Sequence, residues 1–287
     1  VVVSADNKKG TIYMREIIIT TESGSDLPEN LVKKYDIKVI PMHIVMDATS
    51  YADGTISVDK IYEYYNETKK IPTTSAVNVG EYIDFFNEIR AEHPDCVIMH
   101  LAYSSLASST YQNAEIAIRE FEDIYLIDTR NVSGGCTAHL AKAYEIIQAK
   151  KDPVTDYKAL ADEIASWNNK VFCSFIPGNL DYLKAGGRVS NAAYLGATLL
   201  RLKPLIEIVD GQLLASKKYR GSIAKFVDTN MEEYLAKHEV YRKCLFSMYS
   251  TGLSQVALDR MKANATRLGT ESSEYIMTGS AIRCNTC

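Results

Sequence analysis

Several features that mark common protein classes are missing from this chain of 287 residues. No apolar run approaches the roughly 20 residues that a helix needs to cross a bilayer. The sequence also has no clustered stripe of lysine and arginine, and its formal net charge of -4 gives no attraction to nucleic acid or to an anionic membrane. We therefore expect no nucleic-acid partner and at most transient contact with a membrane.

Cysteine is sparse and widely spaced, with six residues in the chain. They lack the dense spacing of a secreted disulfide scaffold, and residues 1–13 lack the features of a signal peptide, so a cytoplasmic location fits best. Met14 resembles a natural start, and we expect residues 1–13 to be upstream sequence. Cys284 and Cys287 have Cys-x-x-Cys spacing, but no helix follows to lower a thiol pKa, so we assign them no redox role.

Sequence motifs of catalysis are absent as well. The five histidines are scattered without metal-ligand spacing, and no Gly-x-Ser-x-Gly nucleophile motif occurs. Ser133-Gly134-Gly135 precedes a predicted helix but lacks the rest of a phosphate-binding loop, and a tight turn explains it better. The sequence therefore predicts no metal, cofactor or catalytic group, which favours a carrier over an enzyme.

What is present is an alternation of short apolar runs with segments of helical period, which is typical of an α/β protein with a parallel sheet between helices. We predict two α/β domains, at residues 14–152 and 153–287. The first has a parallel sheet with helices on both faces, and the second has a mixed sheet with helices. The strands predicted in the first domain are Ile17–Thr21, Lys38–Val45, Cys96–Leu101 and Ile124–Ile127.

Local signals support the helices and turns between these strands. Ser57 is placed to cap a helix over 58–68, and Asn78 and Glu81 have the spacing of a capping box. In the second half, Asp210-Gly211 between two apolar runs predicts an antiparallel hairpin. A helix over 222–238, a strand over 244–249, a helix over 252–268 and a short last apolar run complete the predicted unit.

Two clusters of hydroxyl side chains follow predicted elements of the first domain. Thr74-Ser75 and Ser104-Ser105 both lie where an open parallel sheet places its ligands, and hydroxyls with free backbone N–H groups can surround an anion. Arg188 follows two glycines and offers a guanidinium for a carboxylate or phosphate. The alternative is that the hydroxyls cap the next helices and that Arg188 is an ordinary surface residue.

Taken in order, seven segments resemble the DegV family, and the likeness covers nearly everything after Met14. The resemblance implies two α/β domains around one fatty acid, a protein without catalysis of its own, and a separate ATP-binding fatty acid kinase subunit that phosphorylates the carboxyl group. The segments are Glu22–Pro28, Tyr51–Gly54, Pro72–Ser75, Ser104–Tyr111, Ile127–Thr129, Gly187–Ser190 and Lys203–Gly211.

Carried over by position, the resemblance implies that Thr74 and Ser105 hold the fatty acid carboxylate, with Ser75 beside them and Arg188 near the mouth. Asn285 occupies the position of a family histidine. An amide can hydrogen-bond a carboxylate but cannot carry charge or shuttle a proton. The kinase subunit is expected to approach along an edge with three arginines, Arg188, Arg201 and Arg220.

Other differences from the family pattern are Glu22 in place of an aspartate, and Ala76 and Val77 in place of glutamine and proline. The last residues lack the usual Thr-Gly-Pro-Gly, so we expect a missing final strand or a truncated sequence after Cys287. Two alternative functions remain at this point. One is a hydrolase or phosphotransferase for a small anionic metabolite in the same cleft, and the other is an interaction module without a ligand.

Overall fold

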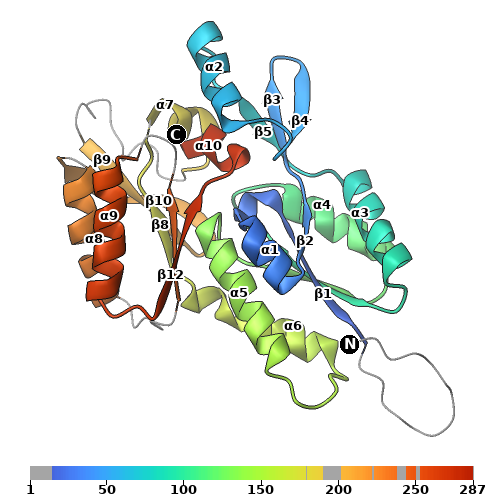
Figure 1. Ribbon diagram of the computed structural model, residues 1–287. Coiled ribbons are helices and arrows are strands. Elements are labelled where there is room, and N and C mark those ends of the chain that lie inside the picture. The colour runs from blue at the N-terminus through green and yellow to red at the C-terminus, as the bar shows by residue number, and fades with distance from the viewer. Residues whose placement is uncertain are drawn as a thin grey trace, which may run out of the picture.

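The computed structural model describes residues 15–178, 180–189, 202–221, 223–237, 244–249 and 253–286. A parallel sheet with strand order β2-β1-β6-β7 forms the first half (Figure 1). Its strands are β1 (Ile17–Glu22), β2 (Lys38–Ile40), β6 (Val97–Ala102) and β7 (Ile124–Asp128). Its helices are α1 (Glu29–Tyr35), α3 (Val79–Glu92), α4 (Thr110–Ala117), α5 (Gly134–Gln148) and α6 (Tyr157–Ala165), with 3₁₀ turns η1 (Ser23–Ser25), η2 (Ile118–Glu120) and η3 (Ser166–Lys170).

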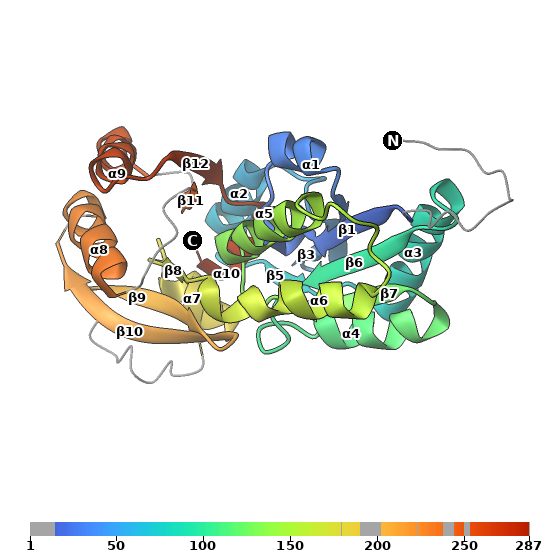
Figure 2. The ribbon, with the colours of Figure 1, turned by 90° about the horizontal axis from the view of Figure 1, so that it is seen from below.

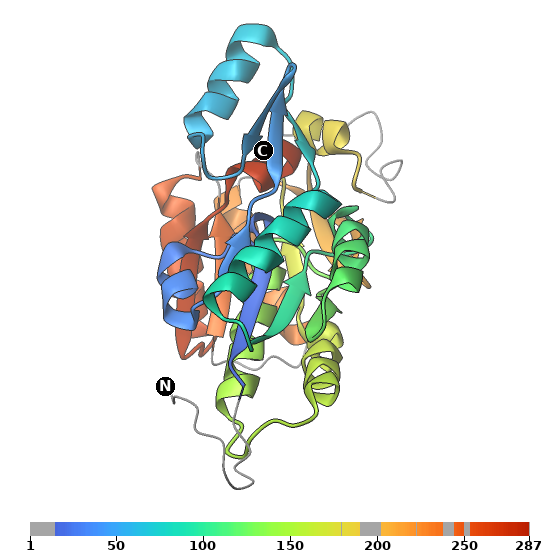
Figure 3. The same ribbon diagram turned by 90° about the vertical axis from the view of Figure 1, so that its right-hand side faces the viewer.

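Helices cover both faces of this sheet, as predicted, because its strands are apolar on both sides. Successive side chains of a strand point to opposite faces. Ile18 and Ile98 therefore join the core under α3 and α4, whereas Ile19 and Met99 join the core under α5 and α6. Figures 2 and 3 show the two helical layers from below and from the side.

One predicted strand is wrong: the segment 38–45 forms two strands that belong to different sheets. Pro41 separates β2 from β3 (His43–Met46), and proline has no N–H with which to continue a ladder. β3 pairs antiparallel with β4 (Thr49–Ala52) and β5 (Thr73–Ser75), and α2 (Val58–Thr68) lies beside this small sheet (Figure 1). The sequence does not predict this sheet.

The caps confirm the local predictions. Ser57 Oγ accepts the Lys60 N–H at the start of α2, which spans the predicted residues. Asn78 and Glu81 form a reciprocal capping box at the start of α3. These ends were predictable because a cap is a contact between neighbours in sequence.

The second half contains antiparallel and parallel strand pairs. β8 (Cys173–Phe175), β9 (Leu202–Val209) and β10 (Gln212–Arg220) form the sheet β10-β9-β8, and β11 (Cys244–Tyr249) pairs parallel with β12 (Ser272–Met277). Asp210 and Gly211 have φ of 48° and 84°, the left-handed conformation that a tight hairpin turn needs, which confirms the predicted hairpin. The helices are α7 (Leu180–Gly186), α8 (Ile223–Lys237), α9 (Gln255–Arg267) and α10 (Ser280–Thr286).

The last helix, α10, is not predicted by the sequence and is central to the site. It contacts α7, β5, β3, α2 and η1, so the end of the chain packs on elements of the first half (Figure 1). Cys284 is buried in a core cluster with Ile44, Ile61 and Tyr182. The domain boundary at residues 152 and 153 stays a prediction, although α6 buries Leu160 and Ile164 in the core of the parallel sheet.

Candidate functional site

Thr74 and Asn285 meet at the contact between β5 and α10. The Asn285 Nδ2 atom donates a hydrogen bond of 3.3 Å to Thr74 Oγ1 and one of 3.0 Å to the carbonyl of Ala281. Thr74 lies opposite Ile44 in the β3–β5 pair, so both side chains face the cluster in which α10 is packed. The sheet pairing and the burial of α10 therefore bring together two of the residues that the sequence predicted.

Arg188 lies next to this pair, in the turn after α7. Its Nη1 atom donates to the carbonyl of Gly186, and a Cβ atom added at Gly186 would lie 2.8 Å from Asn285 Oδ1. The Arg188 side chain is exposed and Val189 is buried in an apolar cluster. Gly186 thus lies between Arg188 and Asn285, Asn285 in turn contacts Thr74, and the Arg188 cation lies at the exposed side.

Ser75 does not share the face of Thr74. It pairs with His43, and the alternation along β5 directs its side chain to the opposite side of the small sheet. His43 Nε2 lies 2.9 Å from Glu81 Oε1 there, and Ser75 is exposed. One carboxylate bound at Thr74 would therefore not meet the Ser75 hydroxyl from the same face.

Ser105 also has a different partner from the one expected. Its hydroxyl donates to Asp128 Oδ2 over 2.6 Å and its backbone N–H donates to Asp128 Oδ1 over 3.3 Å. The neighbouring Ser104 is buried and donates to the carbonyl of Gly211 over 2.7 Å. The second hydroxyl cluster thus joins the ends of β6 and β7 to the tip of the β9–β10 hairpin.

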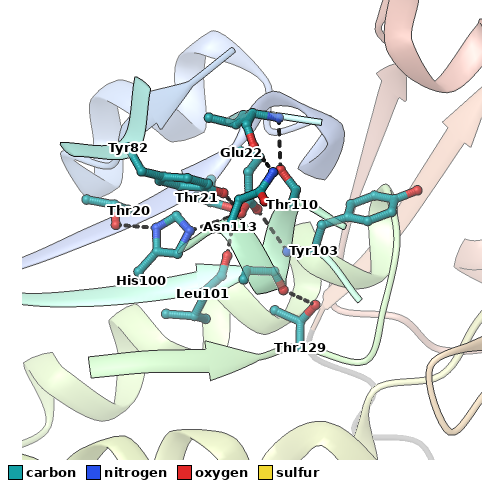
Figure 4. Close-up of polar contacts among 12 residues, drawn as sticks. Thr20, Thr21, Glu22, Tyr82, His100, Leu101, Tyr103, Thr110, Asn113 and Thr129 are labelled. Carbon is teal, nitrogen blue, oxygen red and sulfur yellow. Dashed lines mark hydrogen bonds and ion pairs between the residues drawn. The ribbon is translucent and has the colours of Figure 1, made fainter. Parts of the chain in front are cut away.

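A buried polar network that the sequence reasoning missed lies beneath the loop after β1 (Figure 4). Glu22 is fully buried and accepts three hydrogen bonds, from the Tyr82 hydroxyl, from His100 Nε2 at 3.0 Å and from the backbone N–H of Tyr103 at 2.8 Å. His100 Nδ1 lies 2.7 Å from Thr20 Oγ1. The alternation of side chains along the strands could have predicted this network. Thr20 and Glu22 share one face of β1, and His100, which pairs with Thr20, lies on the same face of β6.

The network fixes the charge of Glu22. Burial by itself raises the pKa of this carboxyl, but the adjacent imidazole and the three hydrogen bonds outweigh burial and leave the pKa below its ordinary value. Burial, together with the Glu22 charge, raises the pKa of Tyr82 well above the usual range, so Tyr82 is the donor. Thr20, His100 and Glu22 thus form a hydroxyl, imidazole and carboxylate array, but all three are buried, so the array is a structural element without access for a substrate.

Among the described residues, no group of three His, Cys, Asp or Glu side chains is arranged to hold a metal ion. Within the same part of the chain, none of the helices combines the length and the apolar character needed to span a bilayer. The site described above therefore consists of hydroxyl, amide and guanidinium groups.

The fold agrees with the comparisons to known proteins. The family model for DegV, described as an uncharacterised protein family, matches residues 16–286. The chain therefore belongs to the DegV family. A DegV domain-containing protein of Clostridium perfringens is 32% identical over 224 residues, which cover 77% of this chain and 78% of that protein.

Two solved structures confirm the α/β fold. A DegV family protein from Thermus thermophilus, described as fatty acid binding, matches with a TM-score of 0.81 and 24% identity over 95% of this chain and 96% of that one. A DegV family protein from Eubacterium eligens, loaded with heptadecanoic acid, matches with a TM-score of 0.80 and 17% identity over 94% of this chain and 96% of that one. These likenesses establish the architecture, and the ligands belong to those proteins.

Proposed function

We propose that this protein is a carrier that binds one long-chain fatty acid between its two halves and has no catalytic group of its own. The observation that carries the proposal is the contact of Asn285 with Thr74, beside Arg188, in a chain of the DegV family. Relatives described as fatty acid binding share the fold. The carboxylate would be held by the five residues Thr74, Ser75, Ser105, Arg188 and Asn285.

Physical chemistry supports these residue types. A buried carboxylate is costly unless several donors meet it, and hydroxyl, amide and guanidinium groups are donors. Both Thr74 and Asn285 are half-buried, and Arg188 supplies positive charge at the exposed side. The Thr74 hydroxyl can donate to a carboxylate, and Asn285 would donate to it in place of one of its two present contacts. Ser105 would have to release Asp128 before it could donate to a ligand, and Ser75 would have to contribute through its backbone.

The tail would supply most of the affinity. Val189 directly follows Arg188 and belongs to an apolar cluster that includes Leu183, Ile206 and Leu213, with Tyr103 of the first half packed against it. Apolar side chains from both halves therefore begin next to the proposed head-group residues. Each buried methylene contributes about 0.8 kcal/mol, so a tail of about fourteen methylenes has roughly 11 kcal/mol available before ordering costs are subtracted.

We also propose that an ATP-binding kinase subunit receives the carboxylate at the edge of Arg188. Arg220, at the end of β10, is exposed, and Arg201 lies outside the described residues. Asn285 can hold the head group but cannot exchange a proton, so the partner would have to supply any acid or base. Acyl phosphate trapped by hydroxylamine, formed only with carrier, kinase subunit and ATP together, tests this step.

The main experiment is native mass spectrometry of freshly purified protein, with a lipid-extracted sample as reference. We expect an adduct of fatty acid mass that disappears on extraction and returns with palmitate or oleate. Thr74→Val should weaken binding, whereas Thr73→Val, at an exposed position on the other face of the same strand, is the matched control and should leave binding unchanged. The carrier proposal fails if the extracted protein binds neither lipid.

A further inference from the structure

Two carboxylates of the first half bind the start of α10, the helix that carries Asn285. Asp26 Oδ1 accepts the backbone N–H of Gly279 over 2.7 Å, and Asp53 Oδ1 accepts that of Ala281 over 3.3 Å. The other oxygen of Asp26 accepts the hydroxyl of Ser133, at the start of α5. One buried side chain thus connects η1, α5 and the last helix, across 253 positions of sequence.

The connection lies within one short helix of Asn285. Gly279 and Asn285 lie at its two ends, about 9 Å apart by the rise of an α-helix. A shift at the first turn therefore moves the amide that contacts Thr74. Gly279 itself leaves no spare room, since a Cβ atom at that position would lie 2.9 Å from Asp26 Oδ1.

We propose that Asp26 is a positioning residue of the head-group site: by accepting the Gly279 N–H it holds the start of α10 and places Asn285 against Thr74. Both protonation states of the side chain can make this connection. A neutral carboxyl can still accept the Gly279 N–H through one oxygen and donate to Ser133 Oγ through the other. A carboxylate keeps both contacts but is a buried charge close to Asp53.

Several charged or titratable groups lie near Asp26 and act on its pKa. Burial, the largest influence, raises the pKa of Asp26 to about 7; its contacts with Ser133 and Gly279 and the Arg283 charge lower it, and Asp53 raises it. Other titratable groups within electrostatic range are Tyr103, Cys136 and Cys173.

Linkage gives the direction of the pH effect on the stability of the whole fold. A carboxyl whose pKa is raised in the fold contributes stability that is largest below its ordinary pKa of about 3.9, and this contribution is lost as pH rises toward 7. The two groups that the last segment supplies, the Gly279 N–H and the Arg283 charge, lower the pKa of Asp26, so contact with α10 favours the carboxylate. The positioning of Asn285 for a fatty acid rests on the proposed function.

Hydrogen exchange of the amides of residues 280–286 in the full chain tests the connection without a ligand. Asp26→Asn keeps an oxygen that can accept the Gly279 N–H and should keep α10 protected. Asp26→Gly removes the connection without strain, because residue 26 has φ of 52°, and should speed exchange of α10.

Palmitate binding by the same proteins completes the test. We expect Asp26→Gly to weaken binding at least tenfold and Asp26→Asn to retain it. Equal exchange of the α10 amides in wild type and Asp26→Gly would overturn the role of Asp26. If the wild type binds no palmitate, the proposed function fails, and the exchange data still decide whether Asp26 holds α10. If wild type and Asp26→Gly bind palmitate equally, the carrier function stands and the positioning role is wrong.

Discussion

Gly186 and Asn285 approach each other so closely that the site has no room for a side chain at position 186. A Cβ atom there would lie 2.8 Å from the Asn285 Oδ1 atom, a distance that real Cβ contacts do not tolerate. The neighbouring Gly187 differs, because it has φ of 65° and no atom within 4 Å of an added Cβ. Substitutions at the two adjacent glycines therefore distinguish a steric clash at position 186 from backbone strain at position 187.

Alanine at position 186 should change the affinity for palmitate, and alanine at position 187 should change the stability of the fold. Gly186→Ala should push Asn285 away from Thr74 and weaken palmitate binding about tenfold, the order expected for a lost hydrogen bond to a charged group. Gly187→Ala should lower the free energy of unfolding by about 1 kcal/mol, through left-handed strain, and leave the affinity unchanged. Titration calorimetry and urea unfolding measure the two quantities, and equal affinities in the two variants would contradict the arrangement.

Substitutions in the Glu22 network should lower the free energy of unfolding by different amounts. His100→Leu leaves a buried carboxylate without its main partner and should cost about 3–5 kcal/mol in unfolding free energy. Thr20→Val leaves the buried His100 Nδ1 atom without its hydroxyl partner and should cost about 1–3 kcal/mol. Urea denaturation checks both values. The double variant Glu22→Gln/His100→Leu should be more stable than the sum of the single effects predicts, and simple additivity would show that the pair is not coupled.

Acid should destabilise the protein partly through Glu22. Because its pKa in the fold is lowered, its contribution is present above the ordinary pKa of about 4.3 and is lost as pH falls through the lower folded value. Melting temperature plotted against pH below 5 should therefore fall more steeply in the wild type than in Glu22→Gln. Glu63→Gln, at an exposed position of α2, is the control and should keep the wild-type slope.

The stability of the β9–β10 hairpin tip should depend on the Ser104 hydroxyl. Ser104→Ala leaves the Gly211 carbonyl without its 2.7 Å donor and should cost about 1–3 kcal/mol. The amides of residues 209–212 should exchange faster, while those of α3 should exchange as in the wild type at conditions far from global unfolding. Unchanged exchange at the hairpin would mean that other contacts hold it against the first half.

Much of the fold was predictable because its signals are local. The cap of α2 at Ser57, the capping box of α3 and the Asp210-Gly211 turn all depend on neighbouring residues, and the structure has each of them. The split of the segment 38–45 was not anticipated, although Pro41 marks it, since the run remains apolar on both sides. α10 was missed because its stability comes from packing against α7 and β5 rather than from its own sequence.

The site was predictable only in part, for a geometric reason. The sequence identified Thr74, Arg188 and Asn285, which the structure brings together. It could not show that Ser75 points away from Thr74, because that follows from the register of β5 with β3. Nor could it show that Ser105 is bonded to Asp128, since this contact requires β6 and β7 to be neighbours.

The small sheet that carries Thr74 is attached to the rest of the molecule at both of its ends. The Met42 N–H donates to Ser23 Oγ over 3.0 Å, and the Val77 N–H donates to Thr110 Oγ1 over 3.1 Å. Residues 43–75 are therefore an insert whose two ends are fixed to the parallel-sheet half and whose inner face packs on α10. A displacement of Ser23 or Thr110 in the parallel-sheet half would therefore be transmitted along the insert to Thr74.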